Sequence, residues 1–215
     1  MPFAVNIDGA EVAEILKPYL PLAEQLGAIF ASVVGDVPKD VEVVFEGDIG
    51  GYDNRLATLA AIKGMLTVLV DEPVSYVNAT SLLAEQGIDV TAVQSSTPND
   101  FVNRLAIRGG GRRIAATVMG RQDEARLVRL DDSIIDIPPA ANMLVVRNDD
   151  HAGMIGIVGT MVGEAGINID DMDVGRTRSD GGAIMVIACR QPVPDQLMAD
   201  LLAVDGIWTV DRVAL

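Results

Sequence analysis

Cysteine, histidine and tryptophan each occur once among the 215 residues of this chain. A single cysteine, Cys189, excludes an internal disulfide and a zinc site made of several thiolates. Its small, weakly polar side chain suits a buried strand. The only histidine, His151, lies in a polar loop, where we expect an exposed side chain rather than a catalytic acid or base. We therefore expect no catalytic residue in this chain.

Long apolar runs are also missing. Hydrophobic residues make up 49% of the chain and the mean hydropathy is +0.31, yet no run approaches the roughly 20 residues of a membrane helix. The first residues, MPFAVNIDGAEV, contain neither a basic region nor an apolar signal core, so we expect a cytoplasmic protein. The net charge of −15 argues against nucleic acid or an anionic membrane as a partner.

Two ligand-binding motifs are absent as well. No G-x-G-x-x-G follows a predicted strand, so a dinucleotide-binding half is not expected here. The nearest run, Gly153, Gly156 and Gly159, has the wrong spacing and fits close helix packing better. The acidic run at residues 170–173 lacks the glutamate that closes a calcium loop. We expect neither a metal nor a cofactor in this chain.

Residues 140–215 carry the clearest structural pattern. An apolar run at residues 143–146 precedes a polar loop, and apolar positions at helical spacing follow Gly153 as far as Gly166. Two strand-like segments, 167–174 and 183–188, flank a Ser-Asp-Gly-Gly turn. A helix after Pro194 and a strand over 207–213 complete the order. This βαββαβ order predicts a ferredoxin-like fold.

The loop that ends at Gly153 predicts a binding site. The start of a helix presents free backbone N–H groups at the positive end of the helix dipole, which suits a carboxylate. Asp150 lies just before those groups and could pair with an ammonium group. A receptor for a carboxylate beside a receptor for an ammonium group describes a free amino acid.

The first 139 residues are predicted to form a separate α/β domain, which makes the whole chain α+β. The linker is the Pro138-Pro139 pair, which cannot continue a central strand. Helical spacing predicts helices over 12–33, kinked or broken at Pro18 and Pro21, over 53–69 and over 81–86. Alternation predicts strands over 41–45, 88–93, 101–107, 113–118 and 126–130, with a hairpin at residues 109–111. The predicted domains are therefore 1–139 and 140–215.

Arginine is concentrated in one part of the acidic chain. Seven arginines fall between residues 104 and 129, against two acids. Exposed strands could carry them for solubility, or they could form a site for a small anion, because guanidinium groups match phosphate oxygens. Arg104 and Arg108 would share one strand face.

The C-terminal motif D-x-A-G-M-I-G followed by G-I-N-I resembles the ACT domain, an amino-acid-sensing module. Asp150, Gly153, Gly166, Asn168 and Ile169 match that family, whereas His151-Ala152 replace its usual Arg-Pro.

A second resemblance spans nearly the whole chain. It rests on A-V-N-I at residues 4–7, L-A-E-Q-L-G at 22–27, L-x-x-L-A-A-I-K-G-M-L at 56–66, V-S-Y-V-N-A at 74–79 and A-E-Q-G-I at 84–88. Together these segments resemble the C-terminal regulatory half of D-3-phosphoglycerate dehydrogenases. That half consists of an intervening, allosteric substrate binding domain followed by an ACT domain.

The resemblance implies a regulatory part of an NAD-dependent oxidoreductase of L-serine biosynthesis, with NAD bound by the parent enzyme outside this chain. It implies L-serine as the effector and a homodimer or tetramer formed through the ACT domain, with Asn168 supplied by the neighbouring subunit. It also implies 3-phosphoglycerate or phosphate at the arginines. At positions that match the family, the effector-binding residues would be Asn148, Asp150 and Asn168, and the start of the helix adds the backbone of Gly153, Met154 and Ile155. Among the expected anion-binding residues, Arg126 lies where the family often places a basic residue, whereas Arg104, Arg108 and Arg129 are expected from the local excess of arginine.

Two alternatives remain open. A subunit related to L-serine dehydratase would be expected to carry a Ser-Ser-Ser-His-Thr run and several cysteines, and this sequence has neither. A free-standing ACT amino-acid sensor is equally compatible with the residues.

Overall fold

A computed structural model describes residues 12–96, 101–179 and 181–215. The chain forms two compact units, Met1–Arg126 and Leu127–Leu215. The boundary between them falls inside a strand, whereas the sequence analysis placed the domain boundary at the Pro138-Pro139 linker. The A-V-N-I segment at residues 4–7 and Asp180 of the predicted turn lie outside the described residues.

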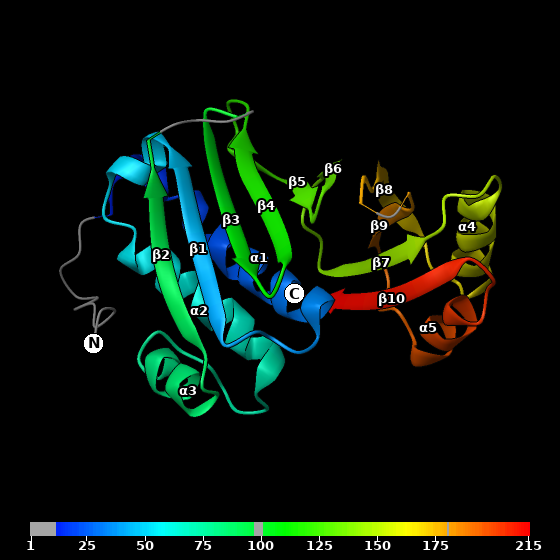
Figure 1. Ribbon diagram of the computed structural model, residues 1–215, viewed down its shortest axis with the longest axis horizontal. Helices are drawn as coiled ribbons and strands as arrows, with labels where there is room; N and C mark the ends of the chain where they lie inside the picture. Colours follow the sequence, from blue (N-terminus) through cyan, green and yellow to red (C-terminus); the bar gives the residue numbers. More distant parts are fainter. Residues whose placement is uncertain (1–11, 97–100, 180) are drawn as a thin grey trace. The chain divides into compact units, whose positions relative to one another are not determined.

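Helices on one face of a sheet form the first unit (Figure 1). The predicted interruption occurs at Pro18, because the short 3-10 helix η1 (Glu14–Leu16) ends before it and α1 (Tyr19–Val34) begins after it. The helix is not broken at Pro21, which lies in the first turn of α1. The other helical elements are η2 (Asp48–Gly51), α2 (Arg55–Leu69) and α3 (Ala79–Glu85). A Cβ at Gly27 would lie 2.0 Å from the Ala61 carbonyl oxygen, and one at Gly64 would lie 1.8 Å from that of Glu24. These two glycines therefore allow α1 and α2 to pack in close contact.

The sheet of the first unit has the strand order β2-β1-β3-β4. Its strands are β1 (Asp40–Gly47), β2 (Asp89–Ser95), β3 (Asn103–Gly109) and β4 (Arg112–Met119). β1 and β2 are parallel, whereas β1–β3 and β3–β4 are antiparallel. Val43, Phe45 and Ile107 are fully buried. Because side chains alternate along a strand, the residues between them face the other side of the sheet.

The second unit contains the predicted βαββαβ order, which is confirmed. Its elements are β7 (Asn142–Asn148), α4 (Met154–Glu164), β8 (Ile169–Arg176), β9 (Ala183–Cys189), α5 (Asp195–Leu202) and β10 (Ile207–Ala214). The antiparallel sheet has the order β10-β7-β9-β8. Leu144, Val146, Met185 and Ile187 of the sheet form one core with residues of α4 and α5, and Cys189 is buried there as predicted.

β5 (Glu124–Leu130) and β6 (Ser133–Ile137) form an antiparallel hairpin, and the sequence analysis missed β6. A Cβ at Gly175 of β8 would lie 2.6 Å from the Ile134 carbonyl oxygen, so β6 lies directly against β8. β6 therefore lies on the face of the sheet opposite α4, and Met143 and Val145 of β7 are also buried on that face.

None of the helices in the described part of the chain is long and apolar enough to cross a membrane.

Candidate functional site

The loop between β7 and α4 is organised by Asn148. Its side chain is fully buried, with the amide nitrogen donating to the Ala183 carbonyl at 3.3 Å and the amide oxygen accepting from the Asp150 N–H at 3.0 Å. Asp150 has a positive φ of 57°, a left-handed conformation that a side-chain hydrogen bond of this kind stabilises. Asn148, which we predicted to bind the effector, therefore holds the loop that presents Asp150.

The Asp150 carboxylate forms an ion pair with Arg176, a residue that the sequence analysis did not include in the site. Its Oδ2 lies 2.9 Å from Nε of Arg176, the last residue of β8. The Arg176 side chain is 82% exposed and that of Asp150 31% exposed. An ion pair so open to water is weak, so Asp150 is accessible for exchange with another cation.

The start of α4 lies directly after this carboxylate. Gly153 precedes the helix with a φ of 99°, which favours glycine, and the first helical bond runs from the Ile157 N–H to the Gly153 carbonyl. The Met154 N–H donates to the His151 carbonyl at 3.3 Å. The Met154 side chain is buried in the core, whereas Ile155 is 49% exposed. The Met154 side chain therefore cannot reach a ligand, and the Met154 N–H already has the His151 carbonyl as its acceptor.

Asp149 closes the other side of the loop. Its N–H donates to the Gly206 carbonyl at 3.0 Å, and its Oδ1 lies 2.6 Å from His151 Nδ1. The hydrogen bond from His151 lowers the pKa of the Asp149 carboxyl group. His151 is exposed, as predicted. The hydrogen bond between Asp149 and Gly206 therefore connects the loop to the residue before β10.

The ring of Trp208, in β10, lies close to Gly182, where an added Cβ would be 2.4 Å from it.

Asn168 lies far from this loop within one chain. It follows α4, whose 11 residues make a helix about 16 Å long. The Asn168 carbonyl accepts from the Arg190 N–H, and its own N–H donates to Gln191 Oε1 at 2.8 Å. Asp150 and Asn168 are therefore at opposite ends of one helix.

The predicted anion-binding arginines have internal partners. Arg104 and Arg108 lie on one face of β3, as predicted, directly opposite Glu46 and Glu42 of β1. Each arginine forms an ion pair with the glutamate that it faces. Arg104 and Glu46 are almost completely buried, at 4% and 8% exposure, whereas the other pair is half exposed. An anion would have to compete with these carboxylates.

The remaining arginines are dispersed. Arg126 and Arg129 both lie on β5, but Arg129 belongs to the second compact unit.

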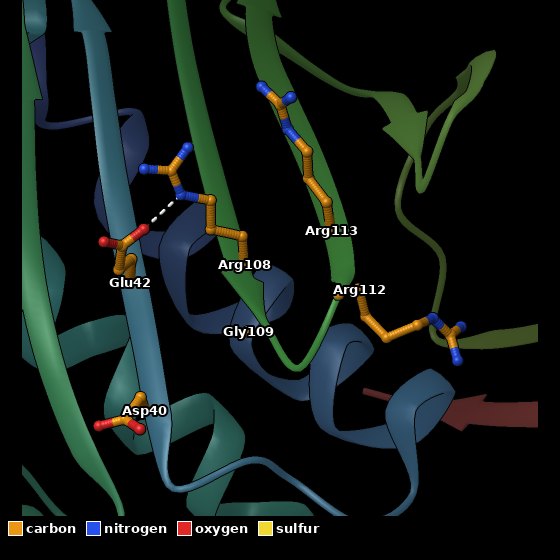
Figure 2. Close-up of a pocket in the computed structure, with 7 residues that line it drawn as sticks. Asp40, Glu42, Arg108, Gly109, Arg112 and Arg113 are labelled. Atoms are coloured by element: carbon orange, nitrogen blue, oxygen red, sulfur yellow. Dashed lines mark hydrogen bonds and ion pairs between the residues drawn. The ribbon is translucent and has the colours of Figure 1, made fainter.

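A groove of about 430 Å³ in the first unit is lined by Asp40, Glu42, Arg108, Gly109, Gly111, Arg112 and Arg113. Figure 2 shows Arg108 turned towards Glu42 and Arg112 turned away from both. Arg112 Nη2 donates to the Val33 carbonyl at 3.1 Å. The sequence showed that arginines are concentrated in this part of the chain, but it could not predict these pairings.

Within residues 12–96, 101–179 and 181–215, no group of three or more histidine, cysteine or acidic side chains could hold a metal ion.

Comparison with known protein families matches two domains. Residues 15–131 match the D-3-phosphoglycerate dehydrogenase intervening domain, and residues 142–206 match the ACT domain. The chain is 35% identical over 210 residues to a D-3-phosphoglycerate dehydrogenase of Synechocystis sp., covering 95% of this chain and 38% of that protein. It is 29% identical over 218 residues to the enzyme of that name from Bacillus subtilis, covering 99% of this chain and 41% of that protein.

The chain thus spans about two fifths of the length of these relatives. The two matched domains follow each other in the order that the sequence resemblance implied. The chain belongs to the D-3-phosphoglycerate dehydrogenase family, of which it represents the intervening and ACT domains.

Proposed function

We propose that this chain is the L-serine-sensing regulatory part of an NAD-dependent D-3-phosphoglycerate dehydrogenase of L-serine biosynthesis, acting in the cytoplasm. The observation that supports it best is the position of Asp150. Its backbone N–H donates to the Asn148 side chain in a left-handed turn, four residues before α4 begins at Met154. A cation receptor and an anion receptor thereby adjoin each other, as a zwitterionic amino acid requires.

In this proposal the ammonium group of serine binds Asp150 and the carboxylate binds N–H groups at the start of α4, which a helix leaves without intrahelical partners. Oxidoreductase chemistry with NAD belongs to other parts of the parent enzyme, because this sequence has no glycine-rich dinucleotide loop after a strand. The chain itself contributes recognition of the effector.

The proposed site is completed by a second copy of the chain. A small amino acid cannot touch both ends of a helix about 16 Å long, so Asp150 and Asn168 of one chain cannot bind the same serine. Pairing of two second units by their sheet edges would let Asn168 of one subunit approach the Asp150 loop of the other. β8, which follows Asn168, is an edge strand of its sheet.

Calorimetric titration with L-serine, glycine and 3-phosphoglycerate tests the ligand. Saturable heat with L-serine, weaker heat with glycine and dependence on Asp150 are expected. Absence of binding to any amino acid at millimolar concentration would eliminate the proposed sensor.

Sedimentation velocity tests the assembly. At micromolar concentration we expect a dimer or tetramer that serine stabilises, because a ligand that binds only the assembled site shifts the equilibrium towards it. A monomer with and without serine would contradict the shared site.

A further inference from the structure

Arg176 occupies the position that the ligand's cation would need. Its Nε lies 2.9 Å from Asp150 Oδ2. The pair is formed by residues from different elements, since Asp150 lies in the β7–α4 loop and Arg176 ends β8. The sequence pattern gave no sign that Arg176 lies next to the β7–α4 loop.

The register of the sheet brings Arg176 to this loop. Arg176 is paired with Ala183 of β9, which is paired on its other side with Asn148 of β7. The three residues form one rung across the sheet, and side chains of one rung point to the same face. The core residues Val146 and Met185 lie two positions away from that rung and pack with α4. Arg176 therefore emerges on the α4 face of the sheet, next to the start of that helix.

We infer that Arg176 is an internal competitor of the amino-acid effector: its guanidinium group occupies Asp150 in the free chain and is displaced by the ligand's ammonium group. This inference rests on the proposed amino-acid site and adds a residue that sets its affinity. In this scheme Arg176 does not bind the ligand. It affects the affinity only through its ion pair with Asp150.

The competition follows from charge. A carboxylate paired with a guanidinium group must lose that partner before it accepts another cation in the same direction. Giving up the guanidinium partner costs little free energy because the pair is exposed to water, where an ion pair contributes between zero and about 1 kcal/mol. Removing Arg176 should accordingly tighten amino-acid binding by about two- to fivefold.

The same competition discriminates between ligands. A hydroxy acid has no ammonium group that could pair with the Asp150 carboxylate, so Arg176 stays bound to Asp150. For such a ligand, removing a positive charge beside the site should weaken carboxylate binding slightly or leave it unchanged. Opposite responses of the two ligands separate displacement of Arg176 from a general electrostatic effect.

The test compares the full chain, Arg176→Ala and the control Arg178→Ala by calorimetry with L-serine and with 3-hydroxypropionate. Arg178 lies two residues after Arg176, in the β8–β9 connection, and its backbone N–H donates to Asp132. We expect Arg176→Ala to bind serine about two- to fivefold more tightly, with no such gain for 3-hydroxypropionate or for Arg178→Ala. Equal or weaker serine binding by Arg176→Ala would overturn the inference.

A second measurement needs no amino acid. The Arg176 Nε–H signal in the NMR spectrum of the free chain should shift when Asp150 is replaced by Asn, and an unchanged signal would also overturn the inference. If that signal shifts but neither the wild type nor Arg176→Ala binds serine, the ion pair exists without competing for an effector. The inference then fails together with the proposed function, whereas serine binding without a gain in Arg176→Ala removes the inference alone.

Discussion

The two units use opposite charges in different ways. In the first unit, Arg104 and Arg108 face Glu46 and Glu42 across two neighbouring strands, so each charge has a partner fixed by the register of a sheet. In the second unit, Asp150 sits on a loop and meets Arg176 in a pair that is largely exposed. The first arrangement stabilises a fold, and the second leaves a carboxylate that can change partner. Charge density alone therefore does not identify a ligand site.

The largest effect should come from breaking the buried pair of the first unit. Arg104→Met leaves the Glu46 carboxylate buried without that guanidinium, and we expect a loss of about 3–5 kcal/mol in unfolding free energy. Urea denaturation measures it. Arg108→Met, which breaks the half-exposed pair, should lose no more than about 1 kcal/mol. The double variant Arg104→Met with Glu46→Gln should regain part of the stability, and equal losses in the two single variants would refute a structural role specific to Arg104.

The next effect concerns the loop. Asp150→Ala should weaken L-serine binding by about 2–4 kcal/mol, or roughly 30- to 1,000-fold, because the ligand's ammonium group is then left without a counter-charge. Calorimetry gives the affinity. Asp195→Ala is a matched control, since Asp195 is also an acid near the start of a helix, here α5, and should leave the affinity unchanged. Parent-like binding by Asp150→Ala would show that the ammonium group binds elsewhere.

A smaller effect tests whether the arginine-rich groove accepts anions. Phosphate or 3-phosphoglycerate must compete with Glu42 for Arg108, so Glu42→Gln should be stabilised more by these anions than the parent. At a concentration ten times the dissociation constant, a ligand adds about 1.4 kcal/mol to stability, which a melting curve detects. An equal shift in the parent and in Glu42→Gln would mean that Arg108 takes no part in anion binding.

The smallest effect is a pH dependence in the second unit. The Asp132 carboxylate accepts from the N–H groups of Arg178 and Ser179, both at 2.8 Å. Burial opposes ionisation of this group, but the backbone hydrogen bonds outweigh it and lower its pKa below the ordinary 3.8. The lowered pKa means that ionised Asp132 stabilises the folded state at pH values above its unfolded-state pKa. That stabilisation is lost as the pH falls through its folded-state pKa.

Asp132→Asn should consequently lose about 0.5–1 kcal/mol at pH 7 and little near pH 2, since a neutral acceptor forms weaker hydrogen bonds. Thermal unfolding at the two pH values measures the difference. A loss that is the same at both would assign the effect to packing instead of charge.

Local pattern predicted most of the fold. Periodicity located α1, α2 and the whole βαββαβ unit, and the break at Pro18 followed from proline chemistry. It missed β6, because this strand has five residues and begins only three residues after β5. Short strands next to a turn give too few alternations to be recognised.

The candidate site was predictable only in part. Its loop and the start of α4 follow from residues adjacent in the sequence. The burial of Asn148 could have been anticipated, since it alternates with Leu144 and Val146 on the core face of β7. The pairs Arg104–Glu46 and Asp150–Arg176 could not, because they join strands and loops that only the register of the sheet brings together.

The contact between Trp208 and Gly182 has a practical consequence. Trp208 is the only tryptophan of the chain, is partly exposed, and lies against the residue that precedes Ala183, whose carbonyl binds Asn148. Indole emission depends on the polarity around the ring. The second unit therefore carries an intrinsic fluorophore beside the proposed ligand loop. If an amino acid binds there as we propose, the emission spectrum should follow binding in real time, without any label and without interference from a second indole.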